Sequence, residues 1–165
     1  MRLCLLFIVE WAVNQLRRRL VPAALIAARD RHGVPGDAIA AKLLQIAILV
    51  VSVFASNNVP FFFVVFGLFL YATGQTLVIC AARENPYFLP VIVAPPVVIR
   101  TGVYRRLRHP GYTGHLVSAS GIWLVWQSLP ALVPLALFAG LLVWRAKRED
   151  ALIHALIQWK PASFS

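Results

Sequence analysis

The feature of this sequence that most limits its fold is a series of apolar runs. Each run approaches the roughly 20 residues that a helix needs to cross the hydrocarbon core of a bilayer. Hydrophobic residues make up 60% of the chain and charged residues only 13%, whereas soluble domains are about half apolar and one quarter charged. The sequence therefore predicts an all-α, polytopic transmembrane bundle. The predicted helices occupy residues 38–56, 61–82, 112–128 and 132–144.

The two ends of the chain carry shorter or more polar helical segments. Residues 3–16 are short for a crossing and contain Glu10. We expect a tilted crossing helix there, with an interfacial helix as the alternative. The last apolar run continues into RAKREDALIHALIQWK, which predicts an amphipathic tail at the membrane surface. The prediction is about five membrane helices, in one integral membrane domain over residues 1–165.

The basic residues indicate how the bundle is oriented. The chain has 16 Lys and Arg residues and a net charge of +10. Of these residues, Arg2 alone falls on the side opposite the loops 17–37 and 83–111 and the C-terminal tail. The positive-inside rule places that basic side in the cytoplasm. The same rule explains the charge without nucleic acid, so the expected partner is the bilayer. A multi-pass protein of the plasma membrane, or of the inner membrane in bacteria, is expected.

A dense polar cluster precedes the helix at 112–128. Arg108 and His109 stand directly before Pro110, which disfavours a helical conformation at His109. A helix is therefore expected to begin at about Gly111 or Tyr112. Its first turn presents unpaired N–H groups and a partial positive charge, which attract anions.

The connection before this cluster cannot be one continuous helix. Residues 83–108 contain several prolines and are otherwise strongly apolar. Non-helical backbone cannot face lipid, because its polar groups would lack partners there. We expect this segment to pack on protein or to line a cavity. At the start of the 38–56 helix, Asp37 is expected to act as the N-cap.

A second polar cluster begins at Arg145. Arg145 and Glu149 are four residues apart, so they share one helix face. The short turn at 129–131 makes the last two helices antiparallel neighbours, which brings both clusters to the same end. Two acids beside a membrane are not needed for topology, so a functional site is indicated. Cys4 and Cys80 lack metal-ligand spacing, and no Gly-rich nucleotide motif occurs. No metal site is expected.

These motifs, taken together, resemble those of a known family. The sequence has GVY at 102–104, RHPGYTG at 108–114, and Arg145 four residues before the acidic pair 149–150. This combination resembles the isoprenylcysteine carboxyl methyltransferase family, which is related to the phospholipid methyltransferases. The resemblance covers about residues 61–157. It implies an integral membrane methyltransferase that binds S-adenosyl-L-methionine at the cytoplasmic ends of its last helices.

The resemblance also implies roles for particular residues. Arg145 would orient the methyl acceptor. The acceptor would be a lipophilic small molecule or a prenylated peptide, methylated on an isoprenylcysteine-type carboxylate or on a phospholipid amine. The residues implied in cofactor binding are Val98, Ile99, Tyr104, His109, Pro110, Tyr112 and Glu149.

Two alternative functions stay open on the sequence alone. The RHPxY motif also occurs in NADPH-dependent membrane reductases of the sterol type, but those enzymes typically carry an acid soon afterwards, where this chain has His115. The tail reads ALIHALIQWKPASFS, with Gln158 where the family usually has glycine. This departure raises the alternative of a catalytically weakened membrane scaffold.

Overall fold

The computed structural model describes residues 15–16, 19, 36–55, 58–85 and 99–158. Within these ranges the chain is helical and has no strand. The expected crossing at 3–16 falls almost entirely outside the described residues. The long helices are α3 (Gly36–Phe54), α4 (Phe61–Glu84), α5 (Pro110–Trp126) and α6 (Leu132–Gln158), and the short 3-10 helices are η1 (Gly102–Arg105) and η2 (Leu129–Ala131).

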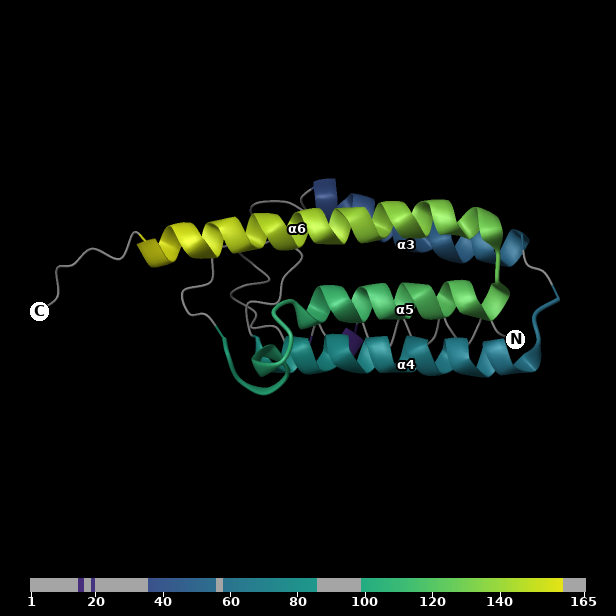
Figure 1. Ribbon diagram of the computed structural model, residues 1–165, viewed down its shortest axis with the longest axis horizontal. Helices are drawn as coiled ribbons and strands as arrows, with labels where there is room; N and C mark the ends of the chain where they lie inside the picture. Colours follow the sequence, from purple (N-terminus) through teal and green to yellow (C-terminus); the bar gives the residue numbers. More distant parts are fainter. Residues whose placement is uncertain (1–14, 17–18, 20–35, 56–57, 86–98, 159–165) are drawn as a thin grey trace, which may run out of the picture.

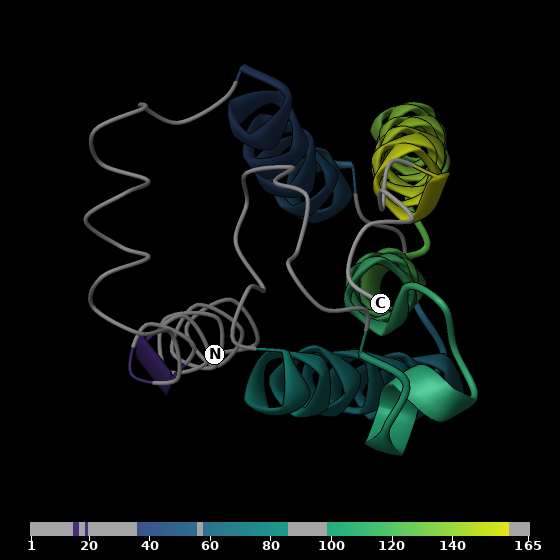
Figure 2. The same ribbon diagram turned by 90° about the vertical axis from the view of Figure 1, so that its left-hand side faces the viewer.

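The four long helices run along the length of the molecule in alternating directions (Figure 1). Helix α5 occupies a central position, with contacts to α3, α4 and α6, whereas α3 packs mainly on α6 (Figure 2). As a result, the start of α3, the end of α4, the start of α5 and the C-terminal part of α6 lie at one end of the bundle. We call this end the polar end, because it carries the two polar clusters of the sequence.

Helices α4 and α5 approach each other closely through small residues. A Cβ atom added at Gly67 would lie 2.8 Å from the Gly121 carbonyl oxygen, and one added at Gly114 would lie 2.7 Å from the Gly74 carbonyl oxygen. Between these contacts, the Ser118 hydroxyl donates a hydrogen bond of 2.9 Å to the Gly114 carbonyl. These small residues therefore serve the close packing of α4 on α5.

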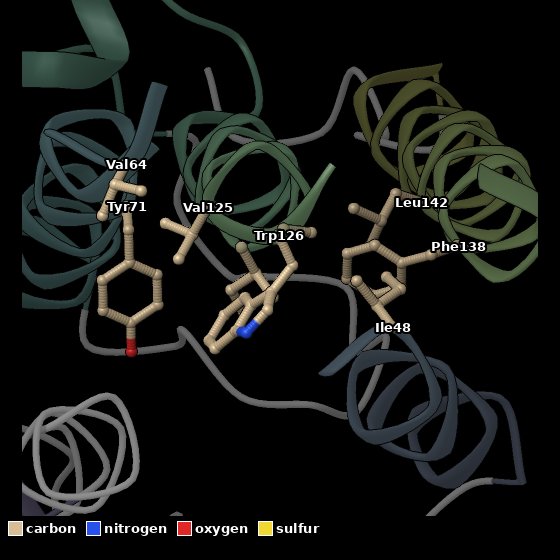
Figure 3. Packing of buried hydrophobic residues seen from close by; sticks show 9 residues of the cluster. Ile48, Val64, Tyr71, Val125, Trp126, Phe138 and Leu142 are labelled. Carbon is tan, nitrogen blue, oxygen red and sulfur yellow. The ribbon is translucent and has the colours of Figure 1, made fainter. Parts of the chain in front are cut away.

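A buried apolar cluster joins all four long helices (Figure 3). Trp126 of α5 lies between Tyr71 of α4 and the pair formed by Ile48 of α3 and Phe138 of α6. The outward faces are apolar too; Phe62 of α4, for example, is 70% exposed. Helices with apolar side chains both inside and outside are characteristic of a membrane bundle.

Three helical segments of the described chain are long and apolar enough to cross a membrane: 36–54, 61–84 and 129–154. Helix α5 has 17 residues, which is at the lower limit of about 17 for a crossing. The expected count of about five membrane helices and the interfacial position of the tail stay predictions. Helix α6 does continue without a break from the apolar run through to Gln158.

Helix α5 is shifted by two residues from the predicted range 112–128. It begins at Pro110, because proline fits the first helical position, where no hydrogen bond from its nitrogen is needed. It ends at Trp126, because Gln127 adopts a left-handed conformation with φ of 47°. Helix α3 likewise begins at Gly36, so Asp37 lies within its first turn and the N-cap expectation was wrong.

Candidate functional site

The two polar clusters of the sequence meet at the polar end of the bundle. Helix α5 begins there, and the C-terminal half of α6 passes over it (Figure 1). The view from this end shows η1 below the start of α5 and α6 above it (Figure 2). The predicted meeting of the two clusters is confirmed by contacts between residues 108–112 and residues 145–154.

His109 is the residue that joins the start of α5 to the acidic pair of α6. It is the N-cap of α5, with φ of −127°, and its side chain makes no capping hydrogen bond. Its imidazole faces α6 instead, with Nε2 3.0 Å from Asp150 Oδ1 and Nδ1 3.6 Å from Glu149 Oε2. Glu149 is the main cause of a raised pKa at His109; Asp150 adds to the effect and partial burial opposes it. These contacts favour the imidazolium form.

Arg108 shares the carboxylate of Asp150 with His109. Arg108 Nε lies 2.9 Å from Asp150 Oδ1, and its Nη2 lies 3.4 Å from His154 Nε2. The Arg108 side chain is 61% exposed, so the pair contributes little to stability. Its effect is to neutralise Asp150, whereas Glu149 pairs with His109.

Tyr112 packs between His109 and Arg145. Its ring stacks on the imidazole, with ring centroids 5.7 Å apart and planes inclined by 26°. The Arg145 guanidinium carbon lies 5.9 Å from the same ring centroid, within the range of a cation–π contact. Tyr112 therefore contacts an imidazole and a guanidinium, and it connects α5 to α6.

Arg145 is almost completely buried, although it belongs to an apolar helix. Its side chain is only 5% exposed, and its Nη1 lies 3.3 Å from Asp37 Oδ2, a carboxylate that is itself 16% exposed. A buried guanidinium needs such a partner, because removal from water without one is costly. The first turn of α3 thus contributes directly to the cluster at the polar end.

The η1 helix is held against the end of α4. The Glu84 carboxylate accepts the Val103 N–H, at 2.8 Å from Oε2 and 3.1 Å from Oε1. Gly102 has φ of +51°, which favours glycine, and a Cβ atom there would collide with the Glu84 carboxylate. Glutamate and glycine are therefore both required for this turn to form.

Tyr104 is placed by this turn beside the last residues of α4. Its hydroxyl lies 3.4 Å from the Ala81 carbonyl oxygen, to which it donates, and 3.3 Å from Asn85 Nδ2, from which it accepts. Burial is the main cause of a raised pKa at Tyr104, and the negative charge of Glu149 raises it further. Tyr104 therefore lies close enough to Glu149 of α6 for the two side chains to interact electrostatically.

The structure brings most of the residues proposed from the sequence into one region. His109, Tyr112, Arg145 and Glu149 form the cluster, with Tyr104 beside it. For two further residues the structure gives burial and position. Pro110 is buried at the first position of α5, and Ile99 is half-buried outside any helix. Val98 lies outside the described residues.

The sequence interpretation missed two members of the cluster. Asp150 was placed in the polar cluster but not in the site, although it contacts both Arg108 and His109. Asp37 was interpreted as a helix cap, yet it pairs with Arg145. A usable signal existed, because the chain has only six acidic residues and an arginine in an apolar helix needs one of them.

Comparison with known proteins identifies one family. The family model described as phospholipid methyltransferase matches residues 62–156. This range contains η1, α5 and nearly all of α4 and α6, and it therefore includes every described member of the cluster except Asp37. No curated protein and no solved structure matches the chain significantly.

Proposed function

Because this chain belongs to the phospholipid methyltransferase family, we propose that it is an integral membrane methyltransferase. It uses S-adenosyl-L-methionine to methylate a lipophilic acceptor. The observation that supports this most strongly is the cluster at the polar end, where the Tyr112 ring contacts both an imidazole and a buried guanidinium. A carboxylate with a cationic neighbour completes this cluster.

The residues present fit the charges of this cofactor. Its methionine end combines a carboxylate, an ammonium and a sulfonium, which require partners of both signs. Glu149 offers a carboxylate that is 30% exposed, and the first turn of α5 has no side-chain cap. We propose that Glu149 pairs with the cationic groups, and that the α5 N-terminus with His109 attracts the carboxylate. When bound, the cofactor supplies an electrophilic methyl group on sulfur.

The other proposed cofactor residues act by shape. Pro110 starts α5 at a fixed position, so the first-turn N–H groups have a defined direction. Tyr112 and Tyr104 both lie near Glu149 and offer aromatic surface. Ile99 would offer apolar surface, and the same role stays a proposal for Val98. In-line methyl transfer needs mainly alignment and exclusion of water, which such a rigid and partly apolar environment supplies.

Arg145 is proposed to orient the acceptor through an anionic group. A phospholipid amine is the acceptor that the charges favour, because its phosphate can approach Arg145 while its amine approaches the carboxylates. An isoprenylcysteine-type carboxylate is the second candidate. Its carboxylate can approach Arg145, but at a peptide C-terminus it brings no amine for the carboxylates of the cluster.

The proposed orientation places the polar end in the cytoplasm. The described Lys and Arg residues lie at or near this end, consistent with the positive-inside rule. A water-soluble cofactor then reaches the cluster from the cytosol, and a lipid acceptor reaches it sideways from the bilayer.

The family match favours methyl transfer over the NADPH-dependent reduction that the RHPxY motif also suggests. His115 Nδ1, at the position where the reductases carry an acid, lies 3.4 Å from Gln45 Nε2 of α3.

Cofactor binding to the purified protein in detergent tests this proposal. Calorimetry should show binding of S-adenosyl-L-methionine or its demethylated product, and weaker or no binding of NADPH. Arg148→Gln is a matched control, because Arg148 belongs to α6 but contacts the Trp144 ring at 5.3 Å rather than the cluster. Tight NADPH binding without any response to the adenosyl ligands would make the reductase the better interpretation.

A further inference from the structure

Asp37 connects the cluster to a helix that the family match does not include. Helix α3 ends before residue 62, where the match begins. Its first turn nevertheless contributes the carboxylate that pairs with Arg145, at 3.3 Å between Oδ2 and Nη1. Both side chains are largely buried, at 16% and 5% exposed. In such surroundings an ion pair is screened little by water or salt.

The remaining acids of the cluster have other cationic neighbours. Asp150 contacts Arg108 and His109, and Glu149 contacts His109. The carboxylate that forms a salt bridge with Arg145 comes from α3 rather than from the helix that carries Arg145. Asp37 also lies in the first turn of α3, where the partial positive charge of the helix N-terminus attracts an anionic side chain.

Two contacts together fix the Arg145 guanidinium. Asp37 holds one terminal nitrogen, and the Tyr112 ring packs at 5.9 Å from the central carbon. The ion pair and the ring contact together restrict how the guanidinium can turn. Loss of Asp37 would remove the salt bridge to this buried cation, so its orientation toward an acceptor should change.

We propose that Asp37 is a positioning residue for the acceptor: it holds Arg145 in the orientation that receives the anionic group of the lipid. This inference rests on the proposed function, because it assumes that Arg145 orients the acceptor. It makes α3 a functional part of the enzyme and separates two roles within the polar end. Glu149 serves the cofactor, and the Asp37–Arg145 pair serves the acceptor.

The test compares Asp37→Asn, Asp37→Glu and the control Arg148→Gln in the full-length protein, reconstituted with phosphatidylethanolamine as acceptor. Asp37→Asn should raise the acceptor KM or lower kcat by roughly ten- to a hundredfold, the effect of losing a charge-assisted contact. Cofactor affinity should stay within a few fold. Asp37→Glu should recover much of the acceptor step, because it restores the charge, and Arg148→Gln should resemble the wild type.

A second readout does not depend on activity. A double-mutant cycle of Asp37→Asn and Arg145→Gln, measured by thermal unfolding, should show that the two changes are coupled. Additive effects would mean that the pair does not form, and the inference would fail. It would also fail if Asp37→Asn weakened cofactor binding as much as the acceptor step, or changed neither.

Failure of the proposed function gives a different pattern. A wild-type protein that transfers no methyl group to any acceptor would overturn the function, and the acceptor role of Asp37 with it, even if the cycle shows coupling. A wild-type protein that transfers methyl groups while Asp37→Asn does so equally well would overturn only the inference about Asp37.

Discussion

Replacement of Glu149 by glutamine gives the sharpest test of how charge is used at the polar end. The change keeps the shape of the side chain and removes its negative charge. If Glu149 pairs with the cationic end of the cofactor, the lost charge-assisted contact contributes about 1.5–3 kcal/mol, or roughly ten- to a hundredfold in affinity. The side chain is 30% exposed, and water screens such a contact, so we expect a loss near tenfold.

The neighbouring acid provides the matched control. Asp150→Asn removes the same charge one residue along α6, but Asp150 contacts Arg108 and His109. Both variants should lower the pKa of His109, because both acids raise it, and Glu149→Gln should lower it more. Only Glu149→Gln should reduce cofactor affinity by about tenfold.

Calorimetry in detergent measures the affinity, and NMR titration of the His109 ring measures the pKa. An equal loss of affinity in both variants would refute the reasoning, because the effect would then come from net charge or from His109. An unchanged affinity in Glu149→Gln would remove Glu149 from the cofactor site altogether.

Three further predictions concern packing, pH and topology. Gly121→Ala should destabilise the protein by about 1–3 kcal/mol, because its Cβ atom would lie 2.6 Å from the Gly67 carbonyl oxygen. Gly140→Ala should not destabilise it, because nothing lies within 4 Å of a Cβ atom there. Thermal unfolding of the two variants tests this difference. His109 has a pKa raised above 6.5. The stability that it contributes relative to His109→Gln should therefore be complete below pH 6.5 and lost as pH rises through the raised value. A difference in melting temperature between the two proteins that grows with pH would contradict this. A cysteine at Thr101 should be labelled from the cytoplasmic side and one at Asn58 from the opposite side; the reverse labelling would invert the orientation and exclude a cytosolic cofactor route.

Much of the scaffold could be predicted from the sequence because its determinants are local. Apolar length predicts the helices, and the small residues of α4 and α5 predict their close contact. Pro110 predicts a helix start at about residue 111 or 112, and α5 begins one or two residues earlier because proline itself takes the first position. Arg145 and Glu149 at a spacing of four predict one helix face, and the structure places both at the polar end.

The determinants that the sequence did not reveal are contacts between distant segments. Asp37 and Arg145 are separated by more than one hundred residues, so no local pattern connects them. Glu84 and Gly102 form a similar long-range pair, in which one acid and one glycine together shape the η1 turn. Asp37 has an ordinary local interpretation as a helix cap, and Gly102 has one as a turn glycine. Only the packing of the bundle shows their contacts with Arg145 and Glu84.

We propose that the polar end transfers a methyl group from S-adenosyl-L-methionine to a membrane lipid. The most direct measurement supplies methyl-labelled cofactor to the full-length protein in phosphatidylethanolamine vesicles, with a prenylated cysteine as the competing acceptor and mass spectrometry of the products. We predict labelled methyl groups on the lipid amine, formed more slowly by Glu149→Gln and Arg145→Ala. Label on neither acceptor, from a wild-type protein that binds the cofactor, would contradict the claim and indicate a non-catalytic scaffold.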